Sequence, residues 1–211
     1  MRLYLSSFRL GHNPRRLVDL TGAGGRVAVI MNACDLLPED ERRIRLEGEC
    51  AALHELGFHP EELDLRKYFD GDDHHAELRS RLESYDLVWA RGGNTFVLRR
   101  AMRMSGFDGI IREMLERDAI VYGGYSAGII VLTPSLHGVE LADDPDSIPE
   151  GYDPEIIWDC LGILPYALAP HYRSDHPESP DIEKVVEYFI DHHMLFRALR
   201  DGEVIVVDGT V

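Results

Sequence analysis

The sequence predicts an α/β fold, a three-layer sandwich with a mainly parallel central sheet, from two observations. Short apolar runs alternate along the chain with amphipathic stretches, the pattern that βαβ units produce. Polar or glycine-rich corners follow several of these runs, where ligands bind in open parallel sheets. The 211 residues can bury a sizeable core without disulfides or structural metal, and we expect a single domain over residues 1–211.

Six short apolar runs are the predicted strands of this sheet. They are Leu3–Leu5, Val27–Met31, Leu87–Ala90, Ile120–Tyr122, Leu164–Leu168 and Val204–Val207. Because helical stretches separate most of them, the sequence indicates parallel pairing.

Four helical segments are predicted from apolar residues that repeat on one face. Pro38 can open the first and Gly57 can close it. The four stripes are Leu46, Cys50 and Leu53; Leu78, Leu82 and Tyr85; Phe107, Ile110, Ile111, Met114 and Leu115; and Ile182, Val185, Val186, Phe189 and Ile190.

The stretch from Leu132 to Leu161 breaks this pattern. It contains four prolines and many acidic residues, and it has little periodicity. Long irregular segments in compact domains are often functional loops. We therefore predict an acidic irregular loop at about residues 133–161, and we leave open whether it closes over a site.

Composition excludes several classes of partner. The formal net charge is −16, so phosphate backbones and anionic membranes are repelled, and we expect neither nucleic acid nor membrane as a partner. The cysteines Cys34, Cys50 and Cys160 form no Cys-x-x-Cys pair, which argues against a zinc site and for a reducing compartment. The N-terminus has no apparent signal peptide, so we expect a cytoplasmic protein. We expect neither a metal nor a cofactor. A homodimer is possible.

The segment Gly124–Gly128 (GYSAG) matches the G-x-S-x-G nucleophile elbow. A predicted strand precedes it and the helix-compatible run Ile129–Leu132 follows, as an elbow requires. The motif makes Ser126 the candidate nucleophile. The alternative is an ordinary glycine-rich turn with a serine that caps a helix.

A serine needs a base, and His171 is the candidate because it follows the predicted strand ending at Leu168. Nine other histidines compete, and seven of them are expected near helix ends or in a loop, where surface roles are usual: His54, His59, His74, His75, His176, His192 and His193. The base in turn needs an acidic partner. The loop after the elbow offers four acids, and composition does not choose among them: Glu140, Asp143, Asp144 and Asp146.

Two backbone N–H groups could stabilise an oxyanion. One belongs to Ala127, directly after the candidate nucleophile, and Gly92-Gly93 could supply the other. The same glycines also fit a plain strand-to-helix turn in which Asn94 or Thr95 caps the helix.

Taken together, these motifs resemble the peptidase E and cyanophycinase family of serine peptidases. The matching segments are Gly92-Gly93-Asn94-Thr95, Gly124–Gly128 and Ile163–Pro165 leading into Pro170-His171-Tyr172. The resemblance spans roughly residues 26 to 208 and implies a class I glutamine amidotransferase-like (flavodoxin-like) fold.

The resemblance also implies roles for individual residues. Ser126 attacks the scissile carbonyl, His171 accepts its proton, and Gly93 with Ala127 form the oxyanion hole. The acid is expected in the loop after the elbow, with Glu140 ranked before Asp144. Substrate contacts are expected from Asn94, Thr95, Tyr125 and Arg173.

The implied activity is hydrolysis of small peptides. Peptidase E cleaves after an N-terminal aspartate, which requires a cation that Arg173 or Arg91 could supply. One alternative is an α/β-hydrolase esterase, which shares the elbow but has an HGGG-type motif that is not evident here. The other alternative is a relative that binds ligands without catalysis.

Overall fold

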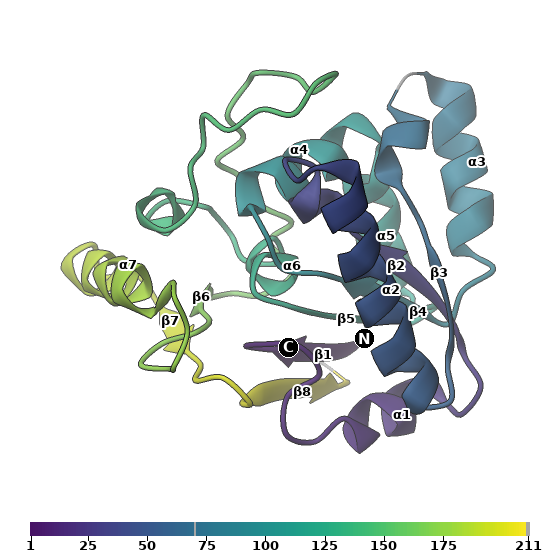
Figure 1. The fold of residues 1–211 in the computed structure, drawn as a ribbon, viewed down its shortest axis with the longest axis horizontal. Coiled ribbons are helices and arrows are strands. Elements are labelled where there is room, and N and C mark those ends of the chain that lie inside the picture. Colours follow the sequence, from purple (N-terminus) through teal and green to yellow (C-terminus); the bar gives the residue numbers. More distant parts are fainter. Residues whose placement is uncertain (70, 210–211) are drawn as a thin grey trace.

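The computed structural model describes residues 1–69 and 71–209. Its six-stranded central sheet has the order β3-β2-β4-β5-β1-β8 (Figure 1). The strands are β1 (Arg2–Ser6), β2 (Arg26–Ile30), β3 (His59–Glu62), β4 (Leu87–Ala90), β5 (Val121–Tyr125) and β8 (Val204–Asp208). Neighbours pair in parallel except β8, which is antiparallel to β1. The predicted α/β fold with a mainly parallel sheet is confirmed.

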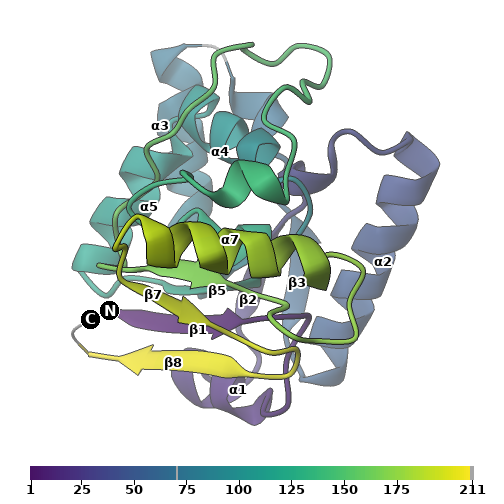
Figure 2. The same ribbon diagram turned by 90° about the vertical axis from the view of Figure 1, so that its left-hand side faces the viewer.

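Helices cover both faces of the sheet, as Figure 2 shows. Helices α1 (Arg15–Thr21) and α2 (Glu39–Glu55) pack on one face. Helices α3 (Asp72–Leu82), α4 (Thr95–Met104) and α5 (Phe107–Glu116) pack on the other. Alternate residues of each strand point to opposite faces, so β4 supplies Leu87 and Trp89 to one core and Val88 and Ala90 to the other.

The predicted helical stripes are the buried faces of their helices. Most of their residues lie in the two cores or in the cluster beneath α7 (Ser179–Asp191). The exception is Ile190, which is 57% exposed near the end of α7. In the described part of the chain, no helix combines the length and apolarity needed to cross a membrane.

The predicted strand Leu164–Leu168 needs correction. Strand β6 spans only Ala167–Ala169, and it pairs with β7 (Phe196–Ala198) in a separate two-stranded sheet. Pro165 has no N–H to donate to a ladder, and the N–H of Leu164 donates to the carbonyl of Leu132 instead. The corner after β6 therefore does not belong to the central sheet. It is joined to the rim of that sheet by a hydrogen bond from the N–H of His171 to the hydroxyl of Ser7, which follows β1.

The acidic segment between α6 (Ala127–Ile130) and β6 has little regular structure. It contains a 3₁₀ turn at Val139–Leu141 and one isolated bridge. Arg100 of α4 is fully buried beneath it and donates to the carbonyls of Glu155 (3.0 Å) and Pro145 (2.8 Å). The loop is thus fastened to α4 through its backbone. Two further 3₁₀ turns follow β2 and β3, at Asn32–Cys34 and Leu65–Tyr68.

Candidate active site

A strained turn connects β5 to α6 at Ser126. The serine has φ 50° and ψ −121°, a backbone conformation that residues other than glycine rarely adopt. The turn also brings α6 very close to β4, because a Cβ at Gly128 would lie 2.1 Å from the carbonyl oxygen of Ala90. A strained serine and a close strand–helix approach are the backbone features that the predicted nucleophile elbow requires.

His171 lies in the corner after β6 and is 1% exposed. Its Nδ1 lies 2.7 Å from Oδ1 of Asp201, in the turn between β7 and β8. The Asp201 carboxylate also accepts from the Ser7 hydroxyl (3.0 Å), and the backbone N–H of His171 donates to that same hydroxyl (2.8 Å). A carboxylate at Nδ1 fixes the proton there and leaves Nε2 free to act as a base.

The two acids that the sequence favoured as the partner of His171 make no contact with its ring within the described residues. Glu140 turns back on its own loop and accepts from the N–H of Gly138 (2.6 Å). Asp144 likewise accepts from the hydroxyl of Ser147 (2.7 Å) and a neighbouring backbone N–H. The carboxylate at His171 is Asp201, which follows the histidine in sequence.

The pKa of His171 is lowered from its ordinary value. Burial of the ring is the largest cause, and the hydrogen bond to Asp201 opposes it. The nearby ring of His176 also disfavours the charged form. The imidazole is therefore held neutral near pH 7, the form in which it can accept a proton.

Ser126 and His171 share neighbours at the rim of the central sheet. Ser6 of β1 pairs with Tyr125 of β5, so Ser7, which binds the His171 backbone, follows β1 as Ser126 follows β5. No hydrogen bond joins Ser126 to the His171 ring within the described residues. Catalytic hydrogen bonds of this kind often tighten only when substrate binds.

Two cavities flank this rim. The smaller, of about 10 Å³, has room for about one water molecule. Its lining consists of Ser126, Ile130, Val139, Ala142, Asp143, Leu168, Glu178, Ile182 and Val185. The larger, of about 850 Å³, is bordered by residues around β1 and α2, together with Tyr125, His176 and Asp201. Ser126 thus borders the small cavity, and Asp201 borders the large one.

The predicted oxyanion donors lie beside the elbow. Within the described chain, the N–H groups of Gly93 and Ala127 donate to no other residue. Gly93 has φ 151°, and a Cβ there would lie 2.4 Å from the carbonyl oxygen of Ala33. Gly92 is close enough that its Cβ would lie 2.9 Å from that of Ser126. Glycines here let the backbone approach the nucleophile.

Asn94 and Thr95 use their side chains to dock the acidic loop. Asn94 caps α4 through the N–H of Val97 (3.0 Å) and donates to the carbonyl of Asp144 (2.9 Å). The N–H and hydroxyl of Thr95 both donate to the carboxylate of Asp143, at 2.8 and 2.5 Å. Their main contacts are therefore with the loop, which they hold against the site.

The remaining predicted substrate contacts differ in exposure. The Tyr125 hydroxyl donates to Glu49 of α2 at 2.5 Å, and the ring borders the large cavity beside Arg91. The Arg173 side chain is 59% exposed, lies over the Tyr172 ring and pairs with Glu183 (3.4 Å). Arg173 thus does not line either cavity.

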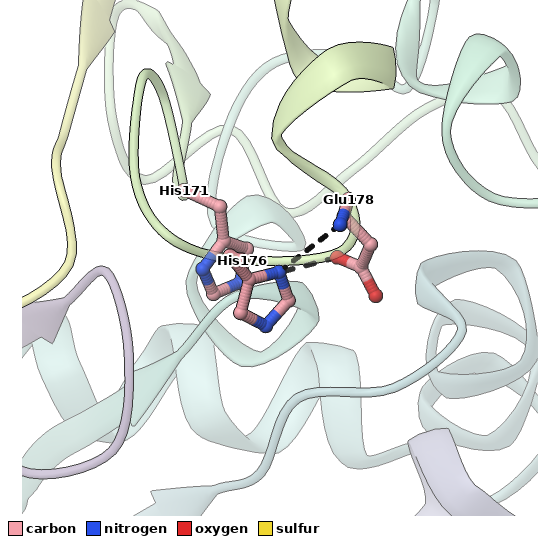
Figure 3. A group of neighbouring side chains, drawn as sticks. All are labelled: His171, His176 and Glu178. Carbon is pink, nitrogen blue, oxygen red and sulfur yellow. Dashed lines mark hydrogen bonds and ion pairs between the residues drawn. The ribbon is translucent and has the colours of Figure 1, made fainter.

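Figure 3 shows His171, His176 and Glu178 close together, with potential metal-binding atoms within 4.8 Å of one another. The two imidazole rings stack with centroids 3.7 Å apart and planes 8° apart. Lone pairs of stacked rings lie in parallel planes, so a single ion could meet both only if one ring rotated. The geometry suits packing around the base better than metal binding.

Comparisons with known proteins agree with this geometry. The model for "Peptidase family S51" matches residues 20–211. Peptidase E of Streptomyces coelicolor is 30% identical over 210 residues, covering 94% of this chain and 76% of that one. A probable alpha-aspartyl dipeptidase of Drosophila melanogaster is 29% identical, covering 75% of this chain and 61% of that one.

A solved structure from Listeria monocytogenes, provisionally described as a peptidase E protein, has the same fold. It superposes with a TM-score of 0.75 at 22% identity and covers 99% of this chain and 98% of that one. A peptidase from an acI-B1 actinobacterium has a TM-score of 0.66 at 14% identity, with 98% and 82% covered. The matched family model and the 30% identical relative show that this chain belongs to peptidase family S51.

Proposed function

We propose that this protein is a serine peptidase that hydrolyses short peptides through an acyl-enzyme on Ser126. The observation that supports this most strongly is the His171–Asp201 pair, whose histidine is buried and is held through Ser7 to the same rim of the sheet at which Ser126 occupies a strained turn. A neutral, oriented imidazole at the same rim as a serine in such a turn supplies the two groups that a base-activated hydroxyl requires.

In the first half of the reaction, Nε2 of His171 takes the proton of the Ser126 hydroxyl while Oγ attacks the scissile carbonyl. The N–H groups of Gly93 and Ala127 donate to the oxyanion that forms. Asp201 stabilises the imidazolium. The C–N bond then breaks, and His171 returns its proton to the departing amine.

In the second half, water replaces the amine. His171 takes a proton from the water as its oxygen attacks the acyl carbonyl, and the tetrahedral intermediate forms again. The Ser126 Oγ leaves with the proton from His171, which frees a carboxylic acid and restores the enzyme.

A preference for N-terminal aspartate, suggested by the name of the Drosophila relative, is the finer version of this proposal. It requires a cation beside the acyl group. Arg173 faces solvent and Arg91 borders the large cavity, so neither supports that preference at the small cavity.

A mixture of dipeptides and tripeptides, followed by mass spectrometry, tests the proposal. We expect a subset to be hydrolysed by the purified protein and none by a Ser126→Ala protein prepared in the same way. Faster turnover of p-nitrophenyl acetate than of every peptide would favour an esterase. Complete inertness toward peptides and esters would favour a binding protein.

The pH dependence of kcat/KM should report the lowered pKa of His171. Only the neutral ring can accept the proton, so activity should fall as pH decreases, with a midpoint below the ordinary histidine value of 6.5. Rates measured between pH 4.5 and 8 check this. Burial raises the pKa of Asp143 to about 6, so this carboxyl also titrates in the range examined. The same profile measured with Asp143→Asn removes that titration, and the midpoint that belongs to His171 should remain. An acidic midpoint above pH 7 in both proteins would contradict the assignment.

A further inference from the structure

The small cavity beside Ser126 has two carboxylates in its lining and no basic residue. The carboxylates are Asp143, from the acidic loop, and Glu178, at the start of α7. All other side chains of the lining are apolar except that of Ser126 itself. A substrate group that approached Ser126 across this lining would meet negative charge from two directions.

Asp143 is held at the N-terminus of α4, where the helix dipole favours an anion. The N–H and hydroxyl of Thr95 donate to the same oxygen of its carboxylate. These two bonds fix the carboxylate, while its other oxygen makes no hydrogen bond within the described residues. That oxygen can still accept from a ligand.

Glu178 links the cavity to the catalytic base. Its carboxylate points toward the two stacked histidines in Figure 3, and its Oε2 lies 4.0 Å from Nε2 of His171. The Glu178 side chain is 45% exposed. Of the salt bridges within the described residues, none joins it to an arginine or lysine. Its charge is therefore not neutralised by a neighbouring cation at the point where substrate would approach.

The large cavity has charged groups of both signs. Arg9, Arg45 and Arg91 contribute to its lining, together with the carboxylates of Glu49 and Asp201. Charge is thus distributed unevenly across the rim, because the charged groups of the small cavity are carboxylates alone, whereas arginines outnumber carboxylates in the large one. A peptide has an ammonium group at one end and a carboxylate at the other, so this distribution favours one direction of binding.

We propose that Asp143 and Glu178 make the subsite beside Ser126 select against acidic groups, so that the preferred substrates are short peptides whose acyl-donating N-terminal residue is neutral or basic. This inference rests on the proposed peptidase function. A carboxylate brought within about 6 Å of either acid would be repelled, and in a partly screened site this costs at least about tenfold in rate.

Two matched series test the inference. In the first, Asn-Leu and Asp-Leu differ only in the charge of the N-terminal side chain, and Lys-Leu adds a cation. We expect kcat/KM for Asn-Leu and Lys-Leu to exceed that for Asp-Leu by at least about tenfold at low salt. The ratio should shrink as ionic strength rises.

The second series needs no knowledge of the substrate. Aryl sulfonyl fluorides that carry an ammonium group, no charge or a carboxylate at one position are compared by their rates of reaction with Ser126. Intact-mass spectrometry follows the adduct. We expect the ammonium probe to react fastest and the carboxylate probe slowest.

The variant Glu178→Gln should reduce the differences in kcat/KM among the dipeptides and in labelling rate among the probes. Glu178→Arg should reverse the order, so that the acidic dipeptide and the carboxylate probe react fastest. Because His171 activates Ser126 toward every substrate and probe alike, an altered base cancels from these ratios. Glu187→Gln is the matched control: it removes the same charge from an exposed position on α7 outside both cavities and should leave the ratios unchanged.

The outcomes separate the two proposals. Labelling of Ser126 with equal rates for all three probes would overturn the charge inference and leave the peptidase function standing. Faster hydrolysis of Asp-Leu than of Asn-Leu by the wild type would overturn it as well. Failure of every probe to label Ser126 would overturn the proposed function and the inference with it.

Discussion

Replacement of Ser126 by alanine should lower kcat/KM for a good peptide substrate by about 10⁴-fold or more, because no other group in the elbow can form the acyl-enzyme. The fold should survive, since the hydroxyl makes no hydrogen bond within the described residues and alanine fits the same space. Initial rates with a fluorogenic peptide, together with far-UV circular dichroism and Tm, check both parts.

Ser80→Ala is the matched control for this change. Ser80 lies on the exposed surface of α3, and its hydroxyl bonds only to the carbonyl of Ala76 within its own helix. We expect this variant to keep full activity. A Ser126→Ala protein that retained more than a few per cent of wild-type activity would show that hydrolysis does not pass through this serine.

Asp201→Asn should be nearly as damaging, with a loss of about 10³- to 10⁴-fold in kcat. The amide has the shape of the carboxylate, but it can donate to Nδ1 and so stabilise the wrong tautomer of His171. It also cannot balance the charge of the imidazolium. Substrate affinity should change little, so the loss should appear in kcat rather than in KM.

Glu140→Gln and Asp144→Asn test the alternative assignments of the acid. Both side chains form hydrogen bonds within the acidic loop, and neither is hydrogen-bonded to His171 within the described residues. Changes of less than about threefold are expected for each. A large loss in either variant, combined with an active Asp201→Asn protein, would return the third role to the acidic loop.

Five of the six strands of the central sheet were predictable because they contain short apolar runs. The strand over Leu87–Ala90 was located to the residue, and β1, β2, β5 and β8 to within a few residues. Strand β3 was missed because its sequence, HPEE, is polar and lies at the edge of the sheet. Strand β7 was missed because three residues provide too little periodicity.

The contact between Asp201 and His171 was not predictable from local pattern, because it depends on the unrecognised β7. Asp201 lies in a turn after the unrecognised β7, with no motif around it. Its proximity to His171 depends on the pairing of β6 with β7, which brings the turn after β7 against the corner after β6. By contrast, the GYSAG turn contains its own conformational requirements, so the strained turn at Ser126 could be expected from sequence.

The docking of the acidic loop was also not predictable, because it depends on contacts between residues far apart in sequence. Asn94 and Thr95 could be recognised as a helix start, but nothing local indicated that Asp143 would bind there. The buried Arg100 that fastens the loop looked like any arginine of an amphipathic helix. Long-range hydrogen bonds of this kind have no periodicity for a sequence analysis to detect.

Reaction of the wild-type protein with a fluorophosphonate, followed by peptide mapping, examines most directly whether His171 and Asp201 activate Ser126. One phosphonate per chain should appear on the peptide containing Ser126, at a rate that drops at least about 100-fold in His171→Ala and in Asp201→Asn. An adduct on another residue, or equal labelling rates in all three proteins, would show that this hydroxyl is not activated by the His171–Asp201 pair.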